Sequence, residues 1–455
     1  MAGSDELALL TAVELIALIR SRAVSPVQII ESHRDAYDAL NPTLNAIVTE
    51  TFDAAIEEAR RAERQLSRDE DVGPLHGLPL AVKDSIETAG VRTTYGSPLY
   101  RDHVPASDAL HVTRLRTAGA ILVGKTNTPE FEAGINTRNP LFGQTLNPWN
   151  LELGCGGSSG GAAVALAAGM CALADGTDHG GSIRIPASVT GVVGFRPSPG
   201  RVPLHPSKWV FDPFSVPGPL ARSARDVALM VSVMAGPDTR IPISLSDSGA
   251  ALAESSTAAR SWRVAWTPDL GGLFAVDPEV ASVAGAAAHR FADLGCAIEY
   301  ASPDWTDARE IIEPLRAFRT AIVTEDLRTR TDGPSNPFLR QFIERAADLP
   351  LVDVARAEGR RSAYWERTAS FFSRFDLLLL PTTPWTAFPK DEEFPASVGG
   401  RSMGGIVEAI LATYAVTIAG LPALSIPCGL TSAGLPVGLQ IVGGWHADAD
   451  ALRAG

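Results

Sequence analysis

One short segment of the sequence combines a serine with two preceding glycines, a pattern that could supply both a nucleophile and an oxyanion site. Residues 178–182 read Asp-His-Gly-Gly-Ser, and an apolar segment follows from Ile183. Two glycines before a serine let consecutive backbone N–H groups converge on one point, as an oxyanion hole requires. Ser182, at the end of such a turn, could attack a carbonyl whose oxygen the turn then binds. The pattern therefore predicts acyl transfer, with an ordinary Gly-Gly turn as the alternative.

A second serine motif lies upstream. Residues 156–160 read Gly-Gly-Ser-Ser-Gly, which satisfies the nucleophile-elbow pattern of α/β-hydrolase esterases with Ser158 as nucleophile, and an Ala-rich helix follows as that elbow requires. The preceding residues 151–155 make a poor strand, and the later histidines stand in no recognisable context for a catalytic base: His205, His289 and His446. A Gly-rich helix start whose serines act as caps explains the motif equally well.

A third motif matches the phosphate-loop pattern. Residues 119–126 read Gly-Ala-Ile-Leu-Val-Gly-Lys-Thr, but a phosphate loop needs an open turn at its four variable positions and a helix after the threonine. Here those positions are apolar, and Pro129 delays any helix. We predict a core strand ending at Gly124, without nucleotide binding.

Taken together, three segments resemble the amidase signature family. They are residues 80–84 (Leu-Ala-Val-Lys-Asp), 156–161 and 178–187, and the spacing of 24 residues between Ser158 and Ser182 is also that of the family. The resemblance spans nearly the whole chain and is weakest from about residue 240 to 375. Further similar segments are 125–131, 139–142, 147–149, 194–197, 380–384, 420–423 and 434–443.

The resemblance implies a Ser–Ser–Lys triad without metal or cofactor. Lys83 matches the base of the family, Ser158 its bridging serine with a cis peptide bond, and Ser182 its nucleophile. The chemistry is coherent because a serine needs a base, and a lysine can serve when burial under residues 80–82 lowers its pKa from about 10.4. The implied oxyanion donors are the backbone N–H groups of His179, Gly180, Gly181 and Ser182.

Four residues near these motifs depart from the family pattern or flank it. Cys155 precedes the signature glycines, where we expect a small buried filler. For His179 we expect a side chain that caps the turn by hydrogen bonding, with substrate contact as the alternative. Asp178 and Arg184 are expected to form an ion pair that holds the turn.

The substrate is not specified by these motifs. In the family it is set by segments that resemble residues 92–142, 205–216 and 384–420, which are rich in aromatic residues here and favour an apolar acyl or aryl pocket. The predicted activity is hydrolysis of an amide, aryl amide or carbamate, and a urethanase or esterase would use the same site. The residues predicted to bind substrate are Tyr95, Phe131, Gly157, Trp209 and Trp385.

Two other functions remain as alternatives. One is the glutaminase subunit of a tRNA-dependent amidotransferase, but residues 412–418 carry no carboxylate where one is expected to hold the glutamine ammonium. The other is a non-enzymatic binding protein on the same fold, against which the intact Lys83, Ser158 and Ser182 argue.

The composition of the chain disfavours some classes of binding partner. The net charge of −13 disfavours nucleic acid and anionic membranes, and the four cysteines lie far apart, which favours reduced thiols. Asp5 and Glu6 precede the first apolar run, so no signal peptide is expected. We predict a cytoplasmic enzyme acting on a small amide, carbamate or ester, with a homodimer as the one protein assembly considered.

The elements that must position these residues alternate between helices and strands, which predicts an α/β fold. Helices are expected from the caps Thr11 and Ser25, the latter helix ending at Asn41-Pro42, and over 53–66, 224–235 and 306–373, with a helix opened by Asp277-Pro278. Strands are expected at 80–82, 120–123, 192–195, 262–266, 296–300, 377–380, 424–426 and 437–442. The resemblance implies a large mixed sheet covered by helices on both sides, with a smaller inserted α/β region. We expect one domain over 1–455, comprising N-terminal helices (1–70), a catalytic core (71–201), a substrate-pocket and inserted region (202–400) and a C-terminal return to the sheet (401–455).

Overall fold

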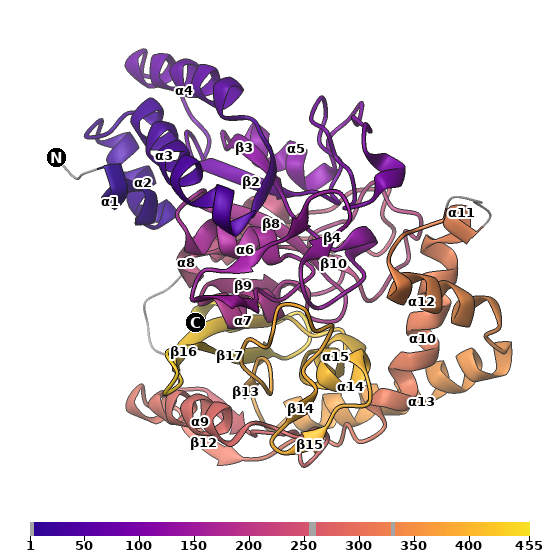
Figure 1. Cartoon of the computed structure of the whole chain (residues 1–455). Helices are drawn as coiled ribbons and strands as arrows, with labels where there is room; N and C mark the ends of the chain where they lie inside the picture. The colour runs from indigo at the N-terminus through magenta and orange to yellow at the C-terminus, as the bar shows by residue number, and fades with distance from the viewer. Residues whose placement is uncertain (1–3, 254–260, 329–332) are drawn as a thin grey trace.

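One mixed sheet of eleven strands runs through the molecule (Figure 1). The computed structural model describes residues 4–253, 261–328 and 333–455. In spatial order the strands are β1 (Ile47–Glu50), β3 (Ile121–Thr126), β2 (Pro79–Lys83), β8 (Leu173–Asp178), β10 (Val216–Ala221), β9 (Val193–Arg196), β16 (Ala423–Leu430), β17 (Pro436–Gly443), β13 (Leu377–Pro381), β11 (Arg263–Trp266) and β12 (Ala297–Tyr300).

Both faces of this sheet are buried because side chains alternate between two apolar layers. In β13, Leu377 and Leu379 belong to one layer, whereas Leu378 and Leu380 belong to the other. The first layer is covered by α2 (Ala12–Arg20), α5 (Leu110–Thr117), α8 (Ala224–Met234), α9 (Pro278–Asp293) and α16 (Asp448–Ala454). The second is covered by α4 (Phe52–Ser67), α6 (Gly160–Ala167), α7 (Arg184–Thr190), α13 (Leu351–Phe372) and α15 (Leu411–Ile418). The predicted large mixed sheet with helices on both sides is therefore confirmed.

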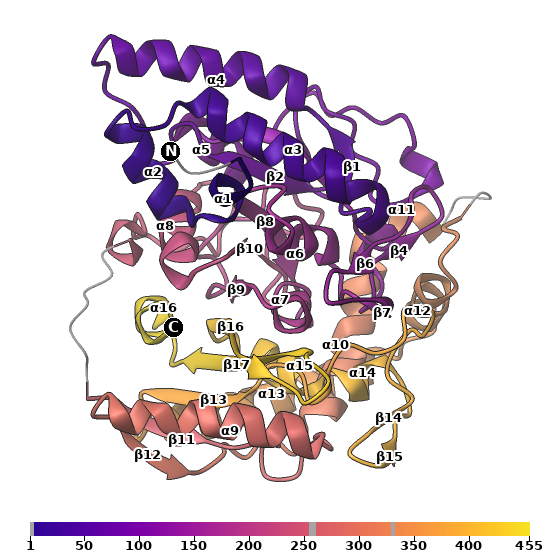
Figure 2. The ribbon, with the colours of Figure 1, turned by 60° about the vertical axis from the view of Figure 1, so that its left-hand side comes forward.

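The remaining elements are short or lie outside these layers. Helix α3 (Pro26–Leu44) packs on α4, and Figure 2 shows both at one end of the sheet with α9 at the other. The other helices are α1 (Ser4–Leu9), α10 (Ala308–Val323), α11 (Glu325–Arg328), α12 (Pro337–Ala347) and α14 (Ile406–Ala409). Three hairpins complete the set: β4 (Arg138–Asn139) with β5 (Gly143–Gln144), β6 (Leu146–Asn147) with β7 (Asn150–Gly154), and β14 (Ser397–Val398) with β15 (Arg401–Ser402).

The predicted helix caps are present, but one predicted helix end is wrong. Thr11 and Glu14 form a capping box, and Ser25 and Asp277 cap α3 and α9. Helix α3 does not end at Asn41-Pro42 but continues to Leu44. Pro42 lies in the last turn, where its missing N–H removes only one helical hydrogen bond, and Asn45 closes the helix in the left-handed conformation. The Asn41 side chain also accepts hydrogen bonds from the N–H groups of Ala46 and Ile47.

Two further segments differ in context from expectation. The stretch expected to be a poor strand does form β7, in a hairpin outside the main sheet. The strand–helix–strand unit of β11, α9 and β12 extends the edge of the main sheet, because β11 pairs in parallel with both β12 and β13. The helical segment predicted over 306–373 contains α10 to α13, and its residues 329–332 lie outside the described residues.

Strand direction explains why the motif residues meet. Strand β2 is parallel to both β3 and β8, so their carboxyl ends lie at the same edge of the sheet. Lys83 ends β2, while Thr177 and Asp178 end β8. Within the described residues, every helix falls short of the length and apolar character that crossing a bilayer requires.

Candidate active site

Lys83 and Ser158 are in direct contact. Lys83 is fully buried at the end of β2, and its Nζ lies 2.7 Å from Oγ of Ser158 in the loop between β7 and α6. The peptide bond between Gly157 and Ser158 is cis, as the resemblance implied. The two residues are 75 positions apart in the sequence and meet because β2 and the α6 loop share one edge of the sheet.

Ser182 lies in the turn between β8 and α7, beside the Ser158 loop. The N–H of Ser159 donates to the carbonyl of Ser182 at 3.0 Å and so fixes the two serine loops relative to each other. Gly181 has φ +112°, and a Cβ on Gly180 would come within 2.7 Å of the Tyr414 ring. Both positions therefore require glycine, the first for its conformation and the second for space.

One of the four predicted oxyanion donors is already engaged. The N–H of Gly181 donates to Oδ1 of Asp178 at 3.1 Å. The N–H groups of Gly180 and Ser182 have no acceptor in the described part of the chain. These two N–H groups are consequently free to bind a substrate oxygen.

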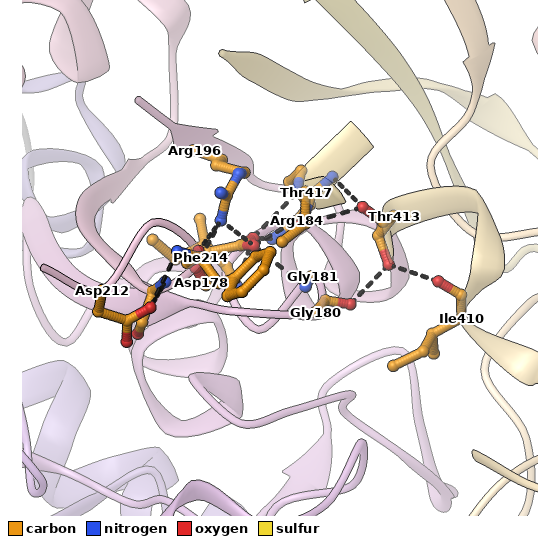
Figure 3. A network of polar contacts seen from close by, with 12 residues as sticks. Asp178, Gly180, Gly181, Arg184, Arg196, Asp212, Phe214, Ile410, Thr413 and Thr417 are labelled. Atoms are coloured by element: carbon orange, nitrogen blue, oxygen red, sulfur yellow. Dashed lines mark hydrogen bonds and ion pairs between the residues drawn. The ribbon is translucent and has the colours of Figure 1, made fainter. Parts of the chain in front are cut away.

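A buried ion network holds this turn in place (Figure 3). Arg184 contacts the Asp178 carboxylate with Nη2 at 2.7 Å and Nε at 2.9 Å, and Arg196 contacts it at 3.2 Å. All three side chains are fully buried. Although burial raises the pKa of Asp178, the two guanidinium groups hold it well below its usual range. The predicted Asp178–Arg184 ion pair is confirmed, and the network carries a net positive charge beside the turn.

Glu132 is the main feature of the site that sequence reasoning missed. Its Oε1 lies 3.0 Å from Lys83 Nζ and accepts hydrogen bonds of 2.6 Å from the hydroxyls of Ser85 and Thr177. Thr177 also accepts a hydrogen bond from Lys83 at 2.9 Å. Glu132 directly follows Phe131, whose predicted role rests only on its ring, and both residues have positive φ (50° and 63°). No spacing rule connects Glu132 to Lys83, since the contact depends on this left-handed bend.

Two opposing effects act on the pKa of Lys83. Burial lowers the pKa of Lys83, which is the predicted direction, and the carboxylates of Glu132, Asp175 and Asp178 oppose the shift. Burial also raises the pKa of Glu132, but the Lys83 ammonium and the two hydroxyls bring it down to about 2. Glu132 is therefore ionised over the whole physiological range.

Ser182 opens onto a cavity that we call the central cavity. Its lining is Phe131, Glu132, Ala133, Gly134, Ile135, Thr177, His179, Gly180, Ser182, Ile185, Arg316, Arg319, Thr320, Val323, Thr324, Leu339, Phe342, Ile406, Ile410 and Tyr414. The apolar members include Phe131, as predicted from sequence. Two arginines from α10 also line it, which the sequence did not indicate because this region resembles the family least.

The other predicted substrate residues do not line the central cavity. Tyr95 lines a neighbouring cavity that shares Glu132 and Thr177 with the central one. Trp209 packs edge-on against Phe318, and Trp385 is buried in the core with its Nε1 donating to Ala409. Gly157 packs against the backbone of Ile135 and Asn136.

The two unusual residues of the motifs behave differently from each other. Cys155 is fully buried, and burial raises the pKa of its thiol to about 12, which fits the expected filler. The expectation that His179 caps the turn is wrong, because neither ring nitrogen has a hydrogen-bond partner in the described residues. Its ring instead packs edge-on against Phe214 and Tyr414.

Comparison with known proteins matches nearly the whole chain to one family. The family model described as Amidase matches residues 28–452. The chain is 37% identical to an acylamidase of Rhodococcus erythropolis over 98% of this chain and 94% of that one. It is 35% identical to a glutamyl-tRNA(Gln) amidotransferase subunit from Synechococcus sp. over 93% of this chain and 91% of that one. Among solved structures, a bacterial aryl acylamidase of the amidase signature enzymes superposes with a TM-score of 0.90, at 31% identity, covering 98% of this chain and 94% of that one.

The fold and these matches define a hydrolase of amide carbon–nitrogen bonds. The chain belongs to the amidase family with the amidase signature, and the protein is an amidase.

Proposed function

We propose that the protein hydrolyses linear amides through an acyl-enzyme on Ser182, with Ser158 as the bridging serine and Lys83 as the base. The observation that carries the proposal is the 2.7 Å contact between Lys83 Nζ and Ser158 Oγ, beside the turn that presents Ser182 to the central cavity. A lysine in hydrogen-bond contact with a serine can remove its proton once the lysine is neutral.

The proposed reaction moves protons along this chain of side chains. Neutral Lys83 takes a proton from Ser158 while Ser158 takes one from Ser182, whose Oγ attacks the amide carbonyl. The bond between the carbonyl carbon and nitrogen breaks as Ser158 returns a proton to the leaving amine. Water, activated by the same groups, then hydrolyses the Ser182 ester and releases the acid.

Stabilisation of the oxyanion comes from the turn. The free N–H groups of Gly180 and Ser182 are the donors, and the net positive charge of the buried Asp178 network lies directly behind them. Donors fixed before the reaction need no reorganisation as negative charge develops on the oxygen. The ion network therefore has a supporting role, by holding the turn in the shape that exposes these donors.

The lining of the central cavity supports an apolar acyl or aryl group on the substrate. Phe131, Ile135, Ile410 and Tyr414 supply apolar surface around Ser182. The names of the similar acylamidase and aryl acylamidase point the same way. Carbamates and esters present the same carbonyl, so urethanase and esterase activities are proposed as side reactions of this site.

A glutaminase role is the second candidate, because a glutamyl-tRNA(Gln) amidotransferase chain is one of the similar proteins. Glutamine carries an ammonium that needs a carboxylate partner. Among the described lining residues of the central cavity, the one carboxylate is Glu132, and it is engaged by Lys83. We therefore favour an amidase over a glutaminase, and an assay for ammonia release from glutamine distinguishes them.

With Ser182 as the proposed nucleophile, we do not favour the alternative of an α/β-hydrolase esterase that uses Ser158. Such an elbow requires a strand of the main sheet before the serine, but β7 lies in a separate hairpin, and Ser158 contacts a lysine.

The expected cytoplasmic location and homodimer remain predictions. All four cysteines are free, in line with a reducing compartment, and sedimentation would give the assembly state.

Replacing the nucleophile tests the proposed function. Ser182→Ala should abolish hydrolysis of 4-nitroanilides, by about 10⁴-fold or more, while the folded protein keeps its circular dichroism spectrum. A fluorophosphonate probe should label Ser182 in the wild type, and mass spectrometry of peptides locates the label. Labelling of Ser158, or near-normal turnover by Ser182→Ala, would show that the roles are assigned wrongly.

A further inference from the structure

The charged residues that line the central cavity do not balance. Three charged side chains are present: Glu132, Arg316 and Arg319. Glu132 is paired with Lys83 at 3.0 Å, and Arg319 is paired with Asp212 at 2.6 Å. The guanidinium of Arg316 has neither an ion pair nor a hydrogen bond in the described part of the chain. One uncompensated positive charge therefore lies in the cavity that holds Ser182.

The guanidinium of Arg316 is held in place without being neutralised. Its Cζ lies 3.7 Å from the centroid of the Phe342 ring of α12, a cation–π contact that holds the group without removing its charge. A cation–π contact uses none of the N–H groups of the guanidinium, which can therefore make a bidentate contact with a carboxylate. Thr320 and Thr324, which follow on the same side of α10, donate their hydroxyls to backbone carbonyls one turn back.

His179 adds a second unused polar group to the same cavity. Its buried ring nitrogens have no partner in the described residues, and contacts with Phe214 and Tyr414 fix the ring. Burial lowers the pKa of His179 well below its ordinary value, and the charges of Arg319 and Arg316 add to the shift. The imidazole is therefore neutral and offers one N–H donor, whose desolvation is uncompensated without a ligand.

We propose that the central cavity binds an amide whose non-reacting end carries a carboxylate, and that Arg316 and His179 are the ligands of that carboxylate. The substrate class is thus a half-amide of a dicarboxylic acid or an N-acyl amino acid, with apolar atoms between the amide and the anion. This class excludes substrates with a free ammonium, because the cavity has no unengaged carboxylate among its described lining residues. This inference rests on the proposed amide hydrolysis and names its substrate class.

Matched substrate pairs test the charge preference. With the carboxylate on the acyl side, the pair is the mono-4-nitroanilide of glutaric acid and the 4-nitroanilide of pentanoic acid. With the carboxylate on the amine side, the pair is N-pentanoyl-4-aminobenzoate and N-pentanoyl-4-methylaniline. In at least one pair, the wild type should show a kcat/KM about tenfold or more higher for the anionic member, mainly through a lower KM.

Variants of Arg316 assign that preference to the subsite. Arg316→Gln should lower kcat/KM for the preferred anion about tenfold more than for its neutral partner, while Arg316→Lys should fall between, because lysine keeps the charge and loses the fork. His179→Phe should act in the same direction with a smaller effect. Arg345→Gln is the matched control, since Arg345 is an exposed arginine on α12 that does not line the central cavity. The control should keep the wild-type preference.

The outcomes separate this inference from the proposed function. If Ser182→Ala is inactive but wild type cleaves the neutral member of both pairs as well as the anionic one, the subsite is refuted and the amidase mechanism stands. Equal losses on both members in Arg316→Gln, or the same selectivity change in Arg345→Gln, would also refute the subsite. If Ser182→Ala retains activity on all four substrates, the proposed function itself fails.

Discussion

Lys83 has two environments that pull its proton affinity in opposite directions. Burial favours the neutral amine, which the proposed mechanism needs, whereas Glu132 at 3.0 Å favours the ammonium. Ser158 Oγ accepts a hydrogen bond from the ammonium, whereas the neutral amine must accept the hydroxyl proton of Ser158 for the proposed transfer. The pH at which the enzyme becomes active should therefore depend on a residue that takes no part in the bond changes.

Glu132→Gln should move the acid limb of the pH profile to lower pH. Removal of the carboxylate charge deprives the ammonium of its nearest counter-charge, so the pKa of Lys83 falls and the neutral base is present at more acid pH. We expect a shift of about one pH unit in kcat/KM. The measurement is kcat/KM for a 4-nitroanilide from pH 5 to 10 in both proteins. Asp175 and Asp178, the other carboxylates acting on Lys83, are unchanged in this variant.

Glu130→Gln provides the control for that shift. Glu130 is buried two residues away, where it accepts a hydrogen bond of 2.6 Å from Ser97, and it does not contact Lys83. It should leave the pH of the acid limb unchanged. An acid limb that stays in place in Glu132→Gln, or moves upward, would show that Glu132 does not control the protonation of Lys83.

At the scale of elements, strand β3 shows why the phosphate-loop pattern fails here. Residues 121–126 pair with β1 on one side and β2 on the other, so their N–H groups are used within the sheet. Lys125 is fully buried and donates hydrogen bonds to the Ile86 carbonyl and to the hydroxyls of Thr88 and Thr93. A strand at this position is confirmed, but its predicted end at Gly124 is wrong, because Gly124, Lys125 and Thr126 also pair within the sheet. Lys125 connects β3 to the loop that follows β2.

Accordingly, Lys125→Met should affect stability and leave no nucleotide phenotype. The substitution removes three hydrogen bonds from a buried site, although the Ile86 carbonyl keeps the Thr88 hydroxyl as a donor, and should lower the unfolding free energy by about 2–4 kcal/mol. Differential scanning fluorimetry with and without Mg-ATP measures both effects. We expect a lower melting temperature in the variant and no shift with ATP in either protein. An ATP-dependent shift in wild type that Lys125→Met removes would contradict the strand-based interpretation.

Local signals in the sequence predict most helices and strands but not which elements pack against each other. Caps such as Thr11 with Glu14 are visible because their geometry involves residues three positions apart. The predicted end of α3 is wrong because Pro42 is tolerated in the last helical turn and the helix is closed by Asn45 in the left-handed conformation. The hairpin of β6 and β7 was not foreseen, because two short polar strands carry little hydrophobic pattern.

At the scale of the whole molecule, contacts between residues far apart in the sequence could not be predicted from sequence patterns. Lys83 was associated with Ser158 only through a family resemblance, since no rule of spacing brings together residues 75 positions apart. The contact of Glu132 with Lys83 depends on a bend after β3, and the approach of Arg316 to the cavity depends on how α10 packs. Both contacts arise from tertiary packing, which sequence patterns specify weakly.

Buried histidines give the whole molecule a predictable response to acid. His33, in α3, is fully buried; its Nδ1 lies 2.8 Å from the Ile29 carbonyl, and its Nε2 has no partner in the described residues. Burial lowers the pKa of His33 from 6.5 to about 3, with a further contribution from the charge of Arg222. Because the unfolded chain binds this proton near pH 6.5 and the folded protein does not, stability is fully present above that pH and is lost progressively as pH falls toward 3.

His33→Leu should make the protein less sensitive to acid. A single histidine with this shift contributes about 1.4 kcal/mol of lost stability per pH unit below its unfolded pKa, or about 2 kcal/mol between pH 6.5 and 5. Leucine has a similar size and no ring nitrogen that is left without a partner, so it should fit the site at neutral pH. The measurement is the urea concentration at half-unfolding at pH 7.5, 6.0 and 5.0 and constant ionic strength. We expect the decrease between pH 7.5 and 5.0 to be smaller in the variant, whereas parallel decreases in the two proteins would mean that the folded protein accommodates the charged imidazole of His33.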